Sequence, residues 1–326
     1  MSGAVAAGPA ALFGLDPASY RRHWLHDGDR TYPETNCYTD LLIELVHAHG
    51  DEPLAILGSI VRLDFETDQW TFFKPHPEDL EAILGLDIHE VQPYRSLPAQ
   101  VADTIADGRT LTIEVDAWFL PDTAATSYRR EHVKTTIAIE AIDRRGERLV
   151  YFHNTSLFAL EGADYRGLFR IDPDPSADVL LPYVELVRFD GARAASDALR
   201  APAASALRRH LDRVGPGNPF TRFGDRLRDV LPALLDGDAA DYHAYAFATV
   251  RMAGAGFDLL AAHTDWLLGE SGGEISAALG RIVEGSKLLG FKLARRRAFD
   301  PDPTIADMAA AWSEAMARLG ERLVAR

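Results

Sequence analysis

The sequence contains a single cysteine, Cys37, and its position favours chemistry at sulfur. Residues 35–50 (TNCYTDLLIELVHAHG) carry apolar residues at helical spacing, begin with Thr35 or Asn36 as an N-cap and end in glycine. Cys37 is therefore predicted in the first turn of a helix, where free N–H groups and the helix dipole favour a nucleophilic thiolate. The alternative is a small core residue, since free cysteines are often buried.

A nucleophilic thiol needs a base, and His132 is the candidate. Residues 133–142 and 148–152 are rich in β-branched and apolar residues and flank a short turn, which predicts an antiparallel hairpin. His132 would precede the first strand and Asn154 would follow the second, so we expect the two side by side across the ladder. Asn154 would then fix the imidazole tautomer and leave the other ring nitrogen for Cys37.

Two alternatives to this base remain open. His132 could be a partly exposed histidine at a strand end with no chemical role. His153 is a rival base, although alternation along the strand directs it to the face opposite Asn154.

Further polar residues are candidates for substrate binding. Gln69 could donate to an oxyanion together with the backbone N–H of Cys37. Asp116 could bind a substrate amine or orient His132, or it could be a solvated acid at a turn. The predicted substrate-binding residues are Asn36, Gln69, Trp70 and Asp116, although aromatic residues at strand spacing, such as Trp70, are more often core.

The composition excludes several classes of protein. At 326 residues, with 47% apolar and 25% charged residues, the chain is long enough for two globular domains. A net charge of −15 argues against nucleic acid or an anionic membrane as the main partner. One cysteine excludes an internal disulfide and a thiolate-rich zinc site, and the histidines lack metal-binding spacing, so no catalytic metal is predicted.

The chain is expected to be cytoplasmic. No apolar run approaches the roughly 18 residues of a membrane span. Residues 1–14 (MSGAVAAGPAALFG) lack the basic start and the cleavage pattern of a signal peptide.

Periodicity divides the chain near residue 190 into an α+β domain and an all-α domain. Before the boundary, helices are predicted at 19–25, 37–49, 76–84 and 96–107, and strands at 69–73, 110–119, 133–142, 148–152, 156–160 and 167–171. After it, helices are predicted at 196–214, 220–235, 239–268, 274–298 and 304–324. The domains are therefore 1–190 and 191–326, and the order Cys, His, Asn in the first is that of papain-like enzymes.

Several long stretches identify a family. The segments FGLDPASYRRHWLH, YPETNCYTDLLIELVH, DQWTFFKP, EVDAWFLPDTAATSYRREHVKTTI and YFHN resemble, nearly residue for residue, the bacterial domain-of-unknown-function family 1839. More distantly, the helix-start cysteine, residues 116–121 and the histidine before an apolar strand are similar to the N-terminal domain of the butirosin biosynthesis acyltransferase. That resemblance covers about the first 160 residues, and Asn154 stands where such relatives often have an acid.

The distant resemblance implies a papain-like thiol domain and an acyl-transfer activity. Cys37 would take an acyl or aminoacyl group from a carrier-protein thioester, and His132 would deprotonate an amine or hydroxyl acceptor. Water as acceptor would make the protein a peptidase, amidase or thioesterase, and a non-catalytic papain-like binding module is the other alternative.

The expected partners follow from this activity. They are an acyl or aminoacyl carrier protein and a small-molecule acceptor. No cofactor is predicted, because the phosphopantetheine arm of the carrier would be a substrate. The arginines 295–297 could dock an acidic carrier protein, or they could be the solvated end of a helix. The helical domain is expected to narrow the cleft of the first domain and to keep water from the acyl-enzyme.

Overall fold

The computed structural model describes residues 9–171 and 182–324, which form two compact units. The first unit comprises Met1–Asp27, Asn36–Pro53 and Leu80–Ala195, and the second comprises Gly28–Thr35, Leu54–Asp79 and Ser196–Arg326. Residues 28–35 and 54–79, which the sequence analysis assigned to the first domain, thus belong to the second unit. The division is discontinuous in sequence because the chain passes between the units more than once.

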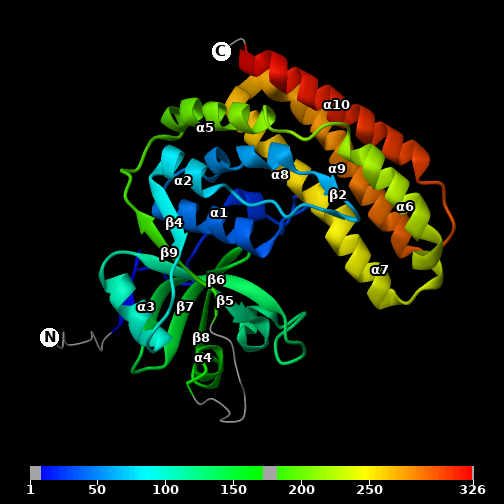
Figure 1. Ribbon diagram of the computed structural model, residues 1–326. Coiled ribbons are helices and arrows are strands. Elements are labelled where there is room, and N and C mark those ends of the chain that lie inside the picture. The colour runs from blue at the N-terminus through cyan, green and yellow to red at the C-terminus, as the bar shows by residue number, and fades with distance from the viewer. Residues whose placement is uncertain (1–8, 172–181, 325–326) are drawn as a thin grey trace. The chain divides into compact units, whose positions relative to one another are not determined.

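The first unit is built on an antiparallel sheet (Figure 1). Its central path has the order β4-β9-β5-β6-β7-β8, and β1 pairs with β6. The strands are β1 (Ala10–Ala11), β4 (Leu86–Glu90), β5 (Thr110–Asp116), β6 (Lys134–Asp143), β7 (Arg148–His153), β8 (Ser156–Glu161) and β9 (Val184–Phe189). The predicted hairpin of β6 and β7 is confirmed, whereas β4 and β9 were not predicted.

The two faces of this sheet differ in chemistry. One face carries alternate apolar residues such as Ile113, Ile137 and Tyr151, which pack in a core with residues of α3 (Leu97–Ala106) and Tyr165 of α4 (Ala163–Leu168). On β6 and β9 the intervening positions include Glu140 and Glu185, which are buried polar residues. Helix α1 (Cys37–His49) packs against β6 and β7.

Helix α1 begins and ends as the sequence predicts. Asn36 is the N-cap, and its side-chain oxygen accepts the Thr39 N–H at 2.9 Å. At the other end Gly50 adopts φ 95°, a left-handed conformation that favours glycine, and its N–H donates to the Val46 and His47 carbonyls. Cys37 is therefore the first residue of a 13-residue helix.

The second unit is mainly helical (Figure 1). Its helices are α5 (Ser196–Leu211), α6 (Pro219–Asp236), α7 (Ala239–Ala246), α8 (Met252–Leu268), α9 (Gly273–Ala294) and α10 (Asp302–Val324). A π-helical turn, η6 (Phe247–Arg251), joins α7 to α8, and a hairpin is formed by β2 (Phe65–Glu66) and β3 (Gln69–Trp70). The overall class is therefore α+β with a helical C-terminal region, as predicted.

Shorter helical elements complete the chain. Helix α2 (Pro77–Leu84) ends before Gly85, as predicted. The short helical turns are η1 (Trp24–His26), η2 (Pro53–Ile56), η3 (Gly58–Arg62), η4 (Ala117–Phe119), η5 (Pro121–Thr123) and η7 (Gly269–Gly272). In the described ranges, no helix combines the length and the apolar character needed to cross a membrane.

Two of the predicted elements are wrong. The strand predicted at 167–171 is replaced by the end of α4, because Tyr165, Leu168 and Phe169 contribute to the core at helical rather than strand spacing. The helix predicted at 19–25 is reduced to the single turn η1, since the buried Glu44 accepts the His23 N–H just before that turn. Both segments are short, and short apolar runs fit either period.

Candidate functional site

Cys37 lies at the first position of α1 and is partly exposed. The position combines accessibility with the N-terminal end of a helix, which is a setting in which reactive cysteines occur. The neighbouring Asn36 is 8% exposed, and its side-chain oxygen is occupied by the Thr39 N–H. Its observed contact is therefore that of a helix cap.

His132 forms a pair with Asp116 in the same unit. Its Nδ1 lies 2.6 Å from Asp116 Oδ2, and its ring stacks on Trp118 with centroids 4.6 Å apart and an interplanar angle of 9°. The His132 side chain is 71% exposed. Asp116 ends β5 and also accepts the Trp118 N–H at 3.0 Å, so the carboxylate and the indole together orient the imidazole. Because the imidazole is exposed and oriented by Asp116, the pair can serve as a base.

The structure does not bring His132 beside Asn154. In the β6–β7 ladder Ala138 pairs with Phe152. Continuing this antiparallel register places Asn154 opposite Thr136, which follows His132 by four residues. Asn154 occupies the two-residue turn between His153 and Ser156 with φ 47°. Asparagine tolerates the left-handed conformation that such a turn requires, which explains its presence without a catalytic role.

The positive φ of Asn154 predicts how substitutions there change the free energy of unfolding. Asn154→Gly should leave the free energy of unfolding within about 0.5 kcal/mol, whereas Asn154→Val should lower it by about 1–2 kcal/mol, because a β-branched residue resists positive φ. Chemical denaturation of both variants measures this difference. Equal losses in the two variants would mean that the amide side chain, rather than the backbone conformation, is what matters.

The hydrogen bond predicted between Cys37 and His132 is absent from residues 9–171 and 182–324. The contacts of His132 in this structure are instead those with Asp116 and Trp118. Catalytic hydrogen bonds often form only in the complex with substrate, so a missing hydrogen bond does not exclude cooperation of the two residues.

His153, the rival base, is fully engaged in the interior. Its Nδ1 lies 2.5 Å from Asp122 Oδ2 and its Nε2 lies 2.8 Å from Thr135 Oγ1, and its side chain is 1% exposed. Tyr151 donates to the same Asp122, and burial together with that carboxylate raises the pKa of Tyr151 well above its usual value. These contacts fix β7 to the η5 turn and leave His153 no free nitrogen for catalysis.

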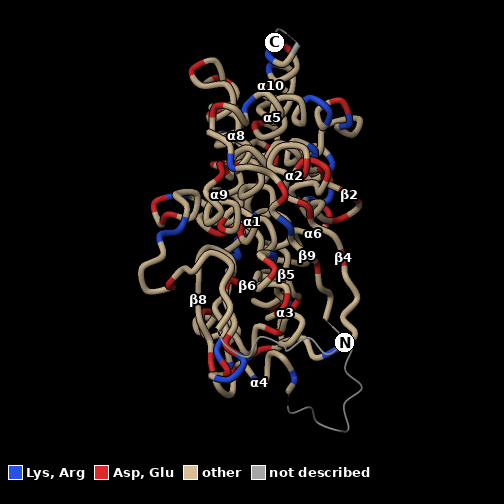
Figure 2. The backbone as a smooth tube through the Cα atoms, turned by 90° about the vertical axis from the view of Figure 1, so that its left-hand side faces the viewer, with Lys and Arg blue, Asp and Glu red and all other residues tan. Residues whose placement is uncertain are grey.

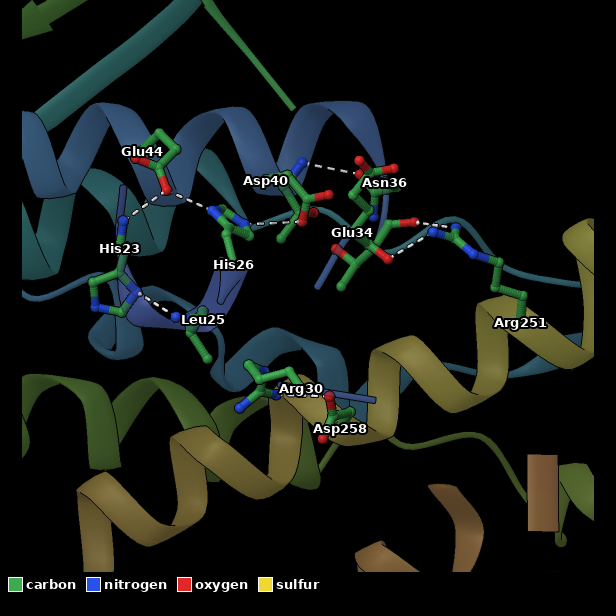
Figure 3. Close-up of polar contacts among 12 residues, drawn as sticks. His23, Leu25, His26, Arg30, Glu34, Asn36, Asp40, Glu44, Arg251 and Asp258 are labelled. Carbon is green, nitrogen blue, oxygen red and sulfur yellow. Dashed lines mark hydrogen bonds and ion pairs between the residues drawn. The ribbon is translucent and has the colours of Figure 1, made fainter. Parts of the chain in front are cut away.

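A second polar cluster lies beneath α1 and was not predicted. His26 Nδ1 lies 2.5 Å from Glu44 Oε1, and His26 Nε2 lies 3.5 Å from Asp40 Oδ1, as Figure 3 shows. Glu44 also accepts the Tyr20 hydroxyl at 2.6 Å and the His23 N–H at 2.9 Å. Asp40 and Glu44 are four residues apart on one helix, which is the sequence signal that could have revealed the cluster.

The cluster holds a buried charge on His26. Burial by itself lowers the pKa of His26, but the N–H groups of the ring face the Asp40 and Glu44 carboxylates, and these contacts outweigh burial and raise the pKa to about 9. His26 is therefore a cation at neutral pH. Because His26 and Glu44 are almost fully buried, this ion pair ties residues 20–26 to α1 rather than binding a ligand from solvent.

Further buried acids line the strands. Glu185 Oε2 accepts the Tyr38 and Thr112 hydroxyls, each at 2.8 Å. Burial raises the pKa of Glu140, which accepts backbone N–H groups of Phe13 and Leu15. These contacts fasten α1, which begins with Cys37, and the N-terminal segment to the sheet.

The remaining predicted residues lie in the second unit. Gln69 is exposed in the β2–β3 hairpin, and Trp70 is 4% exposed. Trp70 packs among aromatic rings, and its ring centroid lies 4.9 Å from that of Phe220. Trp70 is therefore a core residue in this structure. Arg295 stacks over Phe291 at 4.3 Å near the end of α9.

The charged residues are distributed along the whole described chain, and the described side chains form no metal-binding cluster. Figure 2 shows basic and acidic residues interspersed along the chain. Within the part of the chain that the structure describes, no group of three or more His, Cys, Asp or Glu side chains could hold a metal ion.

The fold and these sites define a two-part protein, with a helix-start thiol on an antiparallel sheet and a helical unit. The chain belongs to the DUF1839 family: the DUF1839 N-terminal domain matches residues 21–189 and the DUF1839 C-terminal domain matches residues 196–321. The two family domains thus meet between residues 189 and 196. Comparison with curated proteins gave no match.

Proposed function

We propose that the protein is a thiol-dependent acyltransferase in which Cys37 is the nucleophile. The observation that carries the proposal is the position of the only thiol, which is partly exposed at the first residue of α1. A helix start against an antiparallel sheet is the setting of the nucleophile in papain-like enzymes, to which the sequence order is similar.

The base in this proposal is His132, and Asp116 takes the orienting role predicted for Asn154. The 2.6 Å contact of His132 with Asp116 fixes its Nδ1 as the donor and leaves Nε2 to exchange a proton. Trp118, stacked on the ring, limits the rotation of the imidazole. Substrate binding would have to bring this pair and Cys37 within reach of one reacting group.

The proposed reaction proceeds in two balanced steps. The Cys37 thiolate attacks the carbonyl of a carrier-protein thioester, a new carbon–sulfur bond forms, and the carrier thiol leaves with the proton held by His132. An amine or hydroxyl acceptor then attacks the acyl-enzyme while His132 takes its proton, and Cys37 is released as a thiolate that is reprotonated. The carrier-protein donor rests on the distant resemblance to the butirosin biosynthesis acyltransferase.

Alkylation tests the reactivity of Cys37 directly. At neutral pH, iodoacetamide should modify Cys37 faster than it modifies a free cysteine derivative, because the helix start favours the thiolate. His132→Ala should slow the reaction several-fold if the imidazole reaches the thiol. His89→Ala is the matched control, since His89 is another exposed histidine of the first unit paired with an aspartate, at 3.3 Å from Asp87.

The acyl-transfer step is tested by mass spectrometry of the intact protein. Incubation with an acyl or aminoacyl carrier-protein thioester should add one acyl group to the wild type and none to Cys37→Ala. An amine should discharge that adduct faster than water does, and Asp116→Asn should slow formation by about tenfold or more, whereas Asp87→Asn should not.

The other outcomes are equally informative. Faster discharge by water, or cleavage of peptide amides, would indicate a hydrolase. Absence of any adduct, together with an ordinary alkylation rate that ignores His132, would contradict the catalytic proposal and favour a binding module.

A further inference from the structure

The second unit contains a pocket next to its π-helical turn. The pocket has a volume of about 400 Å³ and is lined by residues of η6, α7 and α9 together with Tyr32. Small-molecule sites in proteins occupy about 300–1,000 Å³, so this pocket is large enough for a small ligand. Cys37 is not among the residues that line it.

The turn η6 gives the pocket its irregular wall. A π-helical turn is rare, and such turns occur frequently at functional sites because they displace side chains from the regular helical positions. Here Thr249 Oγ1 donates to the Tyr245 carbonyl at 2.6 Å, which stabilises the widened turn. The turn carries Phe247, Val250 and Arg251 into the pocket lining.

The lining is positively charged. Arg251 and Lys287 both line the pocket, and none of the lining residues in the described part of the chain carries a carboxylate. Arg251 donates to the carbonyls of Glu34 at 2.7 Å and Thr35 at 3.1 Å, which fix the guanidinium (Figure 3). Among the described residues, no carboxylate forms an ion pair with it. Lys287 lies 3.5 Å from Glu284, but both side chains are exposed, so this pair is weak.

The pocket lining also includes a buried hydroxyl, that of Ser286. Ser286 is 0% exposed and lines the pocket, and its Oγ makes no hydrogen bond among the described residues. Most buried hydroxyls in proteins have a hydrogen-bond partner, because an unsatisfied one destabilises the folded state. A ligand oxygen would satisfy this donor.

The pocket lining also includes the apolar side chains of Phe247 and Val250. Phe247 is 58% exposed although it is a large hydrophobic residue, and the Arg251 guanidinium lies 5.1 Å from its ring centre. Val250 adds a second apolar side chain. The ring of Phe247 and the cation beside it suit a flat apolar body that carries a negative charge.

We propose that this pocket binds a small organic carboxylate, with its apolar body against Phe247 and Val250 and its carboxylate toward Lys287, Arg251 and Ser286. A single negative charge fits better than a phosphate, because Arg251 already uses two of its donors for backbone carbonyls. Phosphate sites draw on several free backbone or arginine donors, which this lining does not provide.

Titration calorimetry of the full chain with 1-naphthoate tests the proposal. Saturable binding with one site is expected, about tenfold tighter than binding of the neutral 1-naphthalenemethanol. Inorganic phosphate should not compete. Cys37→Ala should bind 1-naphthoate as the wild type does, so this result does not depend on the proposed acyl transfer.

Variants of α9 locate the site. Lys287→Gln should weaken 1-naphthoate binding about tenfold, and Ser286→Ala several-fold. Lys292→Gln, on the same helix but outside the lining, is the matched control and should change nothing. Gly290→Leu should abolish binding, because the leucine side chain would fill the pocket that Gly290 lines. The protein should still fold, since an added Cβ has only Val250 within 4 Å, at 3.9 Å, and leucine is a good helix former.

Several results would overturn the proposal. They are equal affinity for the acid and the alcohol, no saturable binding of 1-naphthoate at millimolar concentration, equal effects of Lys287→Gln and Lys292→Gln, or undiminished binding by a folded Gly290→Leu. Competition by inorganic phosphate would instead assign the pocket to phosphorylated ligands.

Discussion

Glu44→Ala should lower the free energy of unfolding of the first unit by about 3–5 kcal/mol, the cost of removing one partner of a buried ion pair. The substitution leaves the buried His26 cation with only the 3.5 Å contact to Asp40. It also removes the acceptor of the Tyr20 hydroxyl and of the His23 N–H. Chemical denaturation, with hydrogen exchange of α1 amides as a local readout, measures the loss.

A matched control separates this effect from the loss of a charge. Glu81→Ala, on the exposed side of α2, should change the free energy of unfolding by no more than about 0.5 kcal/mol. Glu44→Gln should fall between the two, because it keeps an acceptor for Tyr20 but removes the charge. A loss below about 1 kcal/mol in Glu44→Ala would show that the cluster contributes little.

Local signals were sufficient for α1 and for the β6–β7 hairpin. Asn36, the apolar spacing of α1 and Gly50 each act within a few residues, so the helix and the position of Cys37 could be predicted from the sequence. The hairpin follows from two β-branched runs that flank a short turn. In both cases the decisive contacts lie between residues close in sequence.

Long-range contacts were not predictable in the same way. Strand β9 enters the sheet between β4 and β5, and that placement requires Gly85 and Gly191 to meet: a Cβ on Gly191 would lie 2.3 Å from the Leu84 carbonyl oxygen. Neither glycine signals such a contact by itself. The assignment of residues 28–35 and 54–79 to the second unit likewise depends on packing across long sequence separations.

In the candidate site, too, the local features could be predicted from the sequence and the long-range contacts could not. The sequence indicates Cys37, His132 and Asp116, but it predicts a pairing of His132 with Asn154 that holds only if the ends of the two strands are aligned. The observed register places Asn154 beyond the pairing of Ala138 with Phe152, while β5 ends at Asp116, opposite Lys134 and near His132. A shift of a few residues along a ladder thus changes which side chain orients the imidazole.

The stability of the first unit should depend on pH through His26. The pKa of His26 is raised from 6.5 to about 9 in the folded protein, because its hydrogen bonds to Asp40 and Glu44 outweigh burial, which alone would lower it. The folded state therefore holds a proton that the unfolded state releases near pH 6.5. The resulting stabilisation, about 3 kcal/mol, is fully present below pH 6.5 and is lost as the pH rises to about 9.

Denaturation of the wild type and of two variants between pH 6 and pH 9.5 measures this dependence. His26→Gln should be less stable than the wild type at pH 6, and the difference should shrink by about 3 kcal/mol toward pH 9.5, because the variant has no proton to lose. His89→Gln, which changes an exposed histidine of the same unit, should follow the wild-type curve. If the wild type and His26→Gln instead ran parallel across this range, His26 would be neutral in the folded state, and the interaction with Asp40 and Glu44 would be an uncharged hydrogen bond rather than an ion pair.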